Sequence, residues 1–255
     1  MRKLSPISKI YIAAVITIGA AVLVNGIVHW KARLSLEFLA LLAMTLVASR
    51  LRVKLPGING TMSVNLPFVL IVAVQLSSSE SLVIAALASL LQSMPSAQRR
   101  TTLVQSIFNS ATITNAVAVA ALAFGFASHR GLMLPLSIAM AGIAFFLANT
   151  VPVAVVLWLA EGASLVKAWR GMATLSTPYY ALSAGCAAIV CATTQFAVWG
   201  LSLLLLPLMY SIYTSYRLYF AEPAVTEALS AETKPMGRAA VSASSASAAV
   251  NPLNL

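Results

Sequence analysis

The sequence contains no aspartate, and charged residues make up only 9% of its 255 positions. Soluble domains carry roughly 25% charged residues, so this composition excludes an ordinary water-soluble fold. With only two histidines, His29 and His129, the chain has too few ligands for metal-dependent hydrolysis. It also lacks a His-Glu-x-x-His motif, a nucleophile elbow and a phosphate-binding glycine loop. These absences predict a protein that is not an enzyme and uses no cofactor.

Cysteine is also scarce. Cys186 and Cys191 are five positions apart in one apolar run, so on a helix their side chains point to different sides. The spacing therefore predicts neither a disulfide bond nor a metal site.

Apolar residues, in contrast, make up 60% of the chain and gather in eight runs. A helix that spans a membrane needs about 20 apolar residues. The pattern predicts an all-α, polytopic transmembrane bundle of six to eight spans. The runs cover residues 10–29, 34–49, 64–76, 82–94, 103–127, 134–159, 179–195 and 198–213.

Basic residues orient these spans, because cytoplasmic loops keep an excess of Lys and Arg. With a cytoplasmic N-terminus, three basic residues lie outside and eleven inside. We therefore predict a multi-pass protein of the bacterial inner membrane with both termini in the cytoplasm. The outer residues are Lys31, Arg33 and Arg130; the inner ones are Arg2, Lys3, Lys9, Arg50, Arg52, Lys54, Arg99, Arg100, Lys167, Arg170 and Arg217.

Two segments interrupt the run of spans. Residues 51–62 alternate basic and apolar side chains and contain turn residues, which predicts a short extended connector. Residues 64–94 hold two runs that are each short for a full span. They fit either two thin or tilted helices or a re-entrant hairpin, and the charge pattern does not distinguish these alternatives.

The predicted domains are a cytoplasmic N-terminus (1–9), a transmembrane bundle (10–220) and a disordered cytoplasmic tail (221–255) rich in Ala and Ser. The net charge of +10 does not predict nucleic-acid binding, because the basic residues are spread between apolar runs. Contact with the lipid bilayer and its anionic headgroups explains them better. Self-association into a homo-oligomer stays open.

Polar residues inside the spans are the candidate functional residues, since an amide in hydrocarbon must find a partner. Gln105, Asn109, Thr112 and Asn115 follow one another at helical spacing. At 100° per residue they share a face about 120° wide. We predict these four residues as ligand contacts.

Asn149 lies in the neighbouring span, at a depth where it could meet Asn109 across the helix pair. Pro152 lacks an N–H, which leaves the carbonyl of Ala148 unbonded and favours a kink beside Asn149. Asn149 therefore joins the predicted ligand contacts. The alternative is that all these amides are interhelical hydrogen-bonding groups, each contributing roughly 1 kcal/mol.

Several short motifs resemble those of bacterial MASE-type sensory domains, which precede modules that synthesise or degrade cyclic-di-GMP (GGDEF or HD-GYP). The resemblance covers residues 10–220 and implies a membrane sensory domain. The motifs are Arg52-Val53-Lys54-Leu55-Pro56-Gly57, Ser63-Val64-Asn65-Leu66-Pro67-Phe68, Phe108-Asn109, Ala148-Asn149-Thr150, Glu161-Gly162, Trp169-Arg170 and Tyr216-Arg217-Leu218-Tyr219.

The sequence departs from that family's usual pattern because no catalytic motif follows the bundle. The resemblance then implies a sensory or ligand-binding module that acts through a separate cytoplasmic signalling protein. The alternative is a substrate-binding membrane subunit of a vitamin-type uptake transporter, which would act with transporter subunits. Such subunits are similar in size, and they use small residues of the first helix for contact, as Ala13, Ala14, Gly19, Ala20 and Ala21 could provide.

The predicted topology can be tested with a reporter fused after Arg130. We expect the reporter to give a periplasmic signal, because this position lies in an outer turn. A cytoplasmic signal would overturn the order of the spans.

Overall fold

The structure is a computed structural model that describes residues 5–30, 35–54, 61–93, 102–162, 164–193 and 198–215. The chain divides into two compact units, Met1–Tyr213 and Thr214–Leu255. The description concerns the first unit, because only Thr214 and Ser215 are described in the second. The predicted tail (221–255), residues 1–4 and the basic residues Lys31, Arg33, Arg99 and Arg100 lie outside the described residues.

Four helices are long and apolar enough to cross a membrane. They are α1 (Pro6–Val28), α5 (Leu103–His129), α6 (Leu134–Glu161) and α7 (Leu165–Thr193). At 1.5 Å per residue they are about 35 to 44 Å long, more than the hydrocarbon thickness of about 30 Å. The prediction of a helical membrane protein is therefore confirmed.

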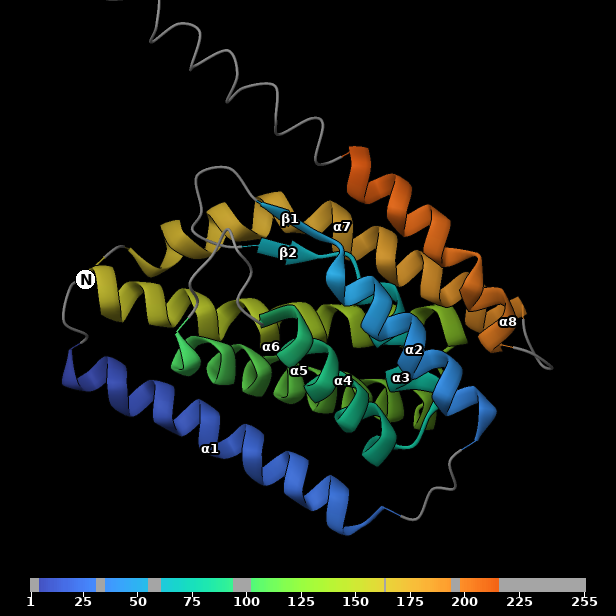
Figure 1. Cartoon of the computed structure of the whole chain (residues 1–255), viewed down its shortest axis with the longest axis horizontal. Coiled ribbons are helices and arrows are strands. Elements are labelled where there is room, and N and C mark those ends of the chain that lie inside the picture. Colours follow the sequence, from blue (N-terminus) through green and yellow to red (C-terminus); the bar gives the residue numbers. More distant parts are fainter. Residues whose placement is uncertain are drawn as a thin grey trace, which may run out of the picture. The chain divides into compact units, whose positions relative to one another are not determined.

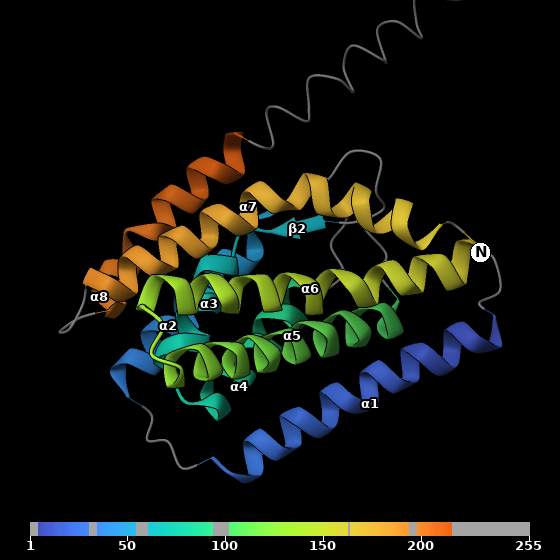
Figure 2. The same ribbon diagram turned by 180° about the vertical axis from the view of Figure 1, so that it is seen from behind.

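The other helices are shorter. They are α2 (Leu36–Arg50), α3 (Leu66–Gln75), α4 (Ser78–Ser93) and α8 (Val198–Leu203), after which residues 205–215 are helical again. Figures 1 and 2 show α5 and α6 side by side, with α1 on one side of the pair, α7 on the other, and α2 to α4 against one face.

Helix α3 lies at the centre of the unit. Its residues Leu66 to Ala73 are all buried, and it contacts α2, α4, α5, α6 and α7. The sequence explains this position, because these residues are apolar on every side of the helix. Ten residues rise only about 15 Å, half the hydrocarbon thickness, so α3 cannot span a membrane by itself.

A tight turn joins α3 to α4. Ser77 donates from its backbone nitrogen and its hydroxyl to the Glu80 carboxylate, at 3.0 and 2.7 Å, and the Ser77 hydroxyl accepts from the Glu80 nitrogen. This arrangement is a capping box that fixes the start of α4. The Ser81 hydroxyl donates to the carbonyl of Val72 (2.8 Å), which satisfies the last turn of α3.

The extended connector predicted for residues 51–62 is present as two short strands. β1 (Arg52–Lys54) pairs antiparallel with β2 (Thr61–Ser63), and Val53 lies opposite Met62. The strand pair links the end of α2 to the start of α3. Residues 55–60, which include the predicted turn, lie outside the described residues.

The predicted start of the seventh helix, at residue 179, is wrong. Helix α7 begins at Leu165 and continues through Pro178. Polar residues interrupt the apolar pattern there, but packing along α6 keeps the segment helical. As a consequence, Lys167 and Arg170 lie on the helix and not in a loop.

Helices α1 and α5 approach closely at Gly19. A Cβ atom on Gly19 would lie 2.7 Å from Cβ and 2.8 Å from Cα of Ala111. Only glycine fits, because part of the obstacle is backbone that cannot rotate away. Gly19 is one of the small residues predicted for contact with a transporter subunit, and here it is buried inside the chain.

This contact predicts that Gly19→Ala lowers the thermal stability of the protein in detergent, by an amount equivalent to about 1–3 kcal/mol. The matched control is Gly125→Ala in α5, where an added Cβ meets no atom within 4 Å. The control should be neutral or slightly stabilising, because alanine favours a helix. Equal stability of the two variants would contradict the close packing of α1 on α5.

Candidate functional site

The first predicted ligand contact, Gln105, caps its own helix. Its side-chain oxygen accepts from the backbone nitrogen of Thr102 (3.0 Å), and the Thr102 hydroxyl accepts from the nitrogen of Gln105 (3.3 Å). This capping box starts α5 at Leu103. The Gln105 side chain is exposed, and it lies ten positions before Asn115 in the same helix.

The second residue of the predicted α5 face, Asn109, bonds to α4. Its amide donates to the hydroxyl of Ser93 (3.0 Å), and the Ser106 hydroxyl donates to the carbonyl of Ser93 (3.1 Å). One turn further, the hydroxyls of Ser89 and Ser110 are 2.9 Å apart. Ser106 and Ser110 lie outside the predicted face, so most of these bonds between α5 and α4 involve residues that the sequence analysis did not select.

The last two residues of the face differ in their partners. The buried Thr112 hydroxyl donates to the carbonyl of Phe108 in its own helix (2.9 Å). The Asn115 amide donates to the carbonyl of Val15 in α1 (3.4 Å), while its Oδ1 atom is buried without a hydrogen-bond partner among the described residues. Asn115 is therefore the predicted residue with unused bonding capacity.

Asn149 does not join this group. Its amide nitrogen donates to the hydroxyl of Tyr180 in α7 (2.8 Å), whereas that of Asn109 donates to α4. The structure thus places Asn109, Asn115 and Asn149 at three interfaces, α4–α5, α1–α5 and α6–α7, while Gln105 and Thr112 bond within α5 and its N-terminal cap. They do not line one cavity.

The interface of α6 and α7 holds a second polar link beside the first. Thr150 accepts from the indole nitrogen of Trp169 (3.1 Å) and donates to the carbonyl of Phe146 (2.7 Å). The Phe146 ring packs edge-on against Tyr180, with centroids 4.9 Å apart, and lies 6.3 Å from the Trp169 ring. We call Phe146, Asn149, Thr150, Trp169 and Tyr180 the α6–α7 cluster.

The neighbouring Tyr179 ties α7 to the central helix. Its hydroxyl, 2% exposed as a residue, accepts from the backbone nitrogen of Leu66 (3.0 Å) at the start of α3. Asn65, the residue just before Leu66, does not cap α3 with its side chain. Tyr179 therefore satisfies a backbone donor that the local sequence leaves open.

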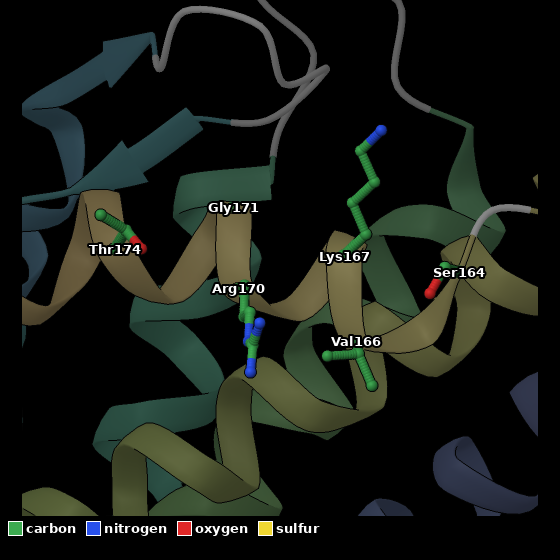
Figure 3. Close-up of a pocket in the computed structure, with 6 residues that line it drawn as sticks. All are labelled: Ser164, Val166, Lys167, Arg170, Gly171 and Thr174. Carbon is green, nitrogen blue, oxygen red and sulfur yellow. The ribbon is translucent and has the colours of Figure 1, made fainter.

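One hollow is present on the surface of α7, lined by Ser164, Val166, Lys167, Arg170, Gly171 and Thr174 (Figure 3). All six lining residues are exposed, and none of them belongs to the α6–α7 cluster. No group of three or more His, Cys, Asp or Glu side chains comes together in the described ranges. Cys186 and Cys191 are buried free thiols.

The MASE9 family model matches residues 14–220 of the chain. The chain belongs to the MASE9 family. This is a family of membrane-associated sensory domains, which confirms the resemblance inferred from the short motifs. No curated protein and no solved structure matches the chain significantly.

Two of the motifs that suggested the family meet in this MASE9 domain, because Trp169 of the Trp169-Arg170 motif donates to Thr150 of the Ala148-Asn149-Thr150 motif. Further along α7, Tyr180 bonds to Asn149, and Tyr179 bonds to Leu66 of the second motif. Segments far apart in the sequence therefore build one connection among α3, α6 and α7.

Sequence reasoning missed Tyr179 and Tyr180, although two signals pointed to them. Adjacent tyrosines in an apolar run carry hydroxyls that need partners. Pro178 lies just before them and weakens one turn of α7, as Pro152 weakens one turn of α6.

The α6–α7 bond predicts an energetic coupling between Asn149→Leu and Tyr180→Phe. In a double-mutant cycle on the free energy of unfolding in mixed micelles, we expect a coupling of about 0.5–1.5 kcal/mol. The control cycle pairs Tyr180→Phe with Asn109→Leu, whose amide bonds to α4, and should be additive within about 0.5 kcal/mol. Additivity in both cycles would show that the bond does not form.

Proposed function

We propose that this MASE9 domain is a multi-pass sensory module of the bacterial inner membrane that changes conformation at the α6–α7 cluster and signals through a separate protein. The family supplies the sensory class. The observation that carries the rest is the pair of hydrogen bonds that join Asn149 and Thr150 of α6 to Tyr180 and Trp169 of α7.

Both helices carry an internal proline near these bonds, Pro152 in α6 and Pro178 in α7. Each proline removes a backbone donor, so the carbonyls of Ala148 and Thr174 lose their usual helical partners. Helices bend most readily at such positions. Side-chain bonds beside two weakened turns favour an element with two discrete packings, which a sensory domain requires.

The output would leave through the connection between α6 and α7. At about 42 and 44 Å, both helices exceed the hydrocarbon thickness, so their joined ends project on the side that the charge pattern assigns to the cytoplasm. Gly162, with φ of 70°, ends α6 in the left-handed conformation. A change in the pairing of α6 with α7 displaces this connection, where a cytoplasmic partner contacts it.

The ligand contacts of this proposal are Asn109, Asn115 and Asn149. Asn115 has the strongest support, because its buried Oδ1 has no hydrogen-bond partner in the described part of the chain. Gln105 and Thr112 were predicted with them, but their side chains bond within their own helical segment. They serve here as capping and packing residues.

The proposed topology has six crossings, formed by α1, α2, α5, α6, α7 and the helical residues 198–215, with both termini in the cytoplasm. The α3–α4 hairpin begins and ends on the cytoplasmic side, with its turn near the outer end of α1. Two contacts support this direction of α4: Gly26, near the outer end of α1, lies against Leu82 and Ser79 at the start of α4, and Ser93 at its end bonds to Asn109, near the cytoplasmic start of α5.

The function can be tested by crosslinking the tagged protein in its native membrane and identifying partners by mass spectrometry. We expect a separate signalling protein, whose recovery changes several-fold in Asn149→Leu. The matched control is Asn25→Leu, an exposed asparagine on α1, which should leave the recovery unchanged. If Asn109→Leu and Asn149→Leu together leave folding and signalling intact, the ligand contacts are refuted.

The same experiment separates the sensory role from the transporter alternative. Recovery of a transporter ATPase together with its membrane coupling subunit would identify a substrate-capture subunit and overturn the signalling role. Recovery of the chain crosslinked only to itself would replace the separate partner with a homo-oligomer.

A further inference from the structure

Gly171 is one of the residues that line the hollow on α7 (Figure 3). A Cβ atom added to Gly171 would meet no atom within 4 Å, so no part of the described chain packs there. A glycine inside a helix costs about 1 kcal/mol relative to alanine. No close contact among the described residues requires a glycine at position 171. The absence of a side chain leaves the backbone of α7 accessible to another molecule at this position.

Two cations border the hollow. Figure 3 shows the Lys167 side chain extending to one side of α7 and Arg170 to the other, with Gly171 directly after Arg170. Both side chains are exposed, and neither forms an ion pair with a described residue. Ser164 and Thr174 add hydroxyl groups at the two ends of the hollow. This set of donors suits a phosphate group.

The depth of the hollow in the bilayer follows from the length of α7. Arg170 lies about 34 Å along the axis from Thr193, where the helix ends. With the hydrocarbon about 30 Å thick, Lys167 and Arg170 fall at the level of the headgroups, and Thr174 lies just inside the hydrocarbon. The cations belong to the face that the charge pattern assigns to the cytoplasm, where anionic lipids gather.

Small side chains continue from the hollow along the exposed side of α7. Thr174, Pro178, Ala181 and Gly185 recur at spacings of four, three and four residues, and all are exposed. An added Cβ at Gly185 also meets nothing within 4 Å. This face leaves room for an acyl chain to lie against the helix, directly beside the charged hollow.

We propose that the hollow is a binding site for an anionic phospholipid of the cytoplasmic leaflet. The exposed Lys167 and Arg170 side chains turn in from the two sides of α7 to bind the phosphate, Gly171 lets it approach the helix backbone, and an acyl chain follows the face from Thr174 to Gly185. This inference is independent of the proposed signalling role, since it rests on residues outside the α6–α7 cluster. Trp169, however, connects the two, because its indole bonds to Thr150 one position before Arg170.

The test measures lipid binding to the purified protein by native mass spectrometry, with phosphatidylglycerol and phosphatidylcholine of identical acyl chains as probes. We expect wild type to retain phosphatidylglycerol preferentially. Gly171→Leu adds a bulky side chain where a Cβ atom meets no atom within 4 Å, and it should abolish the preference. Its matched control is Gly125→Leu in α5, where an added Cβ atom also meets no atom within 4 Å, and which should keep the headgroup preference.

A second pair of variants separates a site from general attraction to basic residues. Lys167→Gln with Arg170→Gln should weaken phosphatidylglycerol binding roughly twenty-five-fold, at about fivefold per charge. Lys9→Gln with Arg50→Gln removes two exposed cations from the same predicted side and should have little effect. Equal losses in the two double variants, or an unchanged preference in Gly171→Leu, would overturn the proposal.

Inorganic phosphate distinguishes the lipid from a soluble anion. We expect phosphate to leave bound phosphatidylglycerol in place, because the acyl chain contributes to binding. If phosphate displaces the lipid completely and protects wild type but not Gly171→Leu in a thermal-shift measurement, the hollow binds free phosphate and the lipid assignment is wrong.

Discussion

The fold depends on enclosing α3, a ten-residue helix that is too short to cross a membrane. Hydrocarbon offers no hydrogen bonds, so both ends of such a helix must find partners within the protein. Tyr179 of α7 accepts from Leu66 at its start, and Ser81 of α4 donates to Val72 near its end. The surrounding helices supply apolar contact on every side. The positions of α4 and α7 thus follow from the needs of α3.

The sequence predicts the helical membrane fold well, because each apolar run leaves a signal that needs no tertiary information. The extended connector before α3 was predictable for the same reason, from its alternation and turn residues. The start of α7 was not, because Lys167, Arg170 and Pro178 resemble a loop when packing on α6 is unknown. Local helix propensity determines where a helix begins or ends only if packing against neighbouring helices does not override it.

The sequence identified which polar residues lie inside the helices, but it did not predict which residues they bond to. The half-buried Asn109 and Asn149 do form interhelical hydrogen bonds, yet they bond to different helices. Helical periodicity places residues on a face, but it does not specify which helix covers that face. Tyr179 shows the limit most clearly, since its partner is 113 positions away in the sequence and is a backbone nitrogen.

That separation also determines when the protein can finish folding. Helix α3 leaves the ribosome long before α7, so a nascent chain carries a short apolar helix whose first turn has no cap until Tyr179 has been made. Assembly of the centre is therefore a late, non-local step. A chain that stops before α7 lacks both the hydrogen bond at the start of α3 and one of the helices that enclose it, so completion of the centre waits for the last third of the sequence.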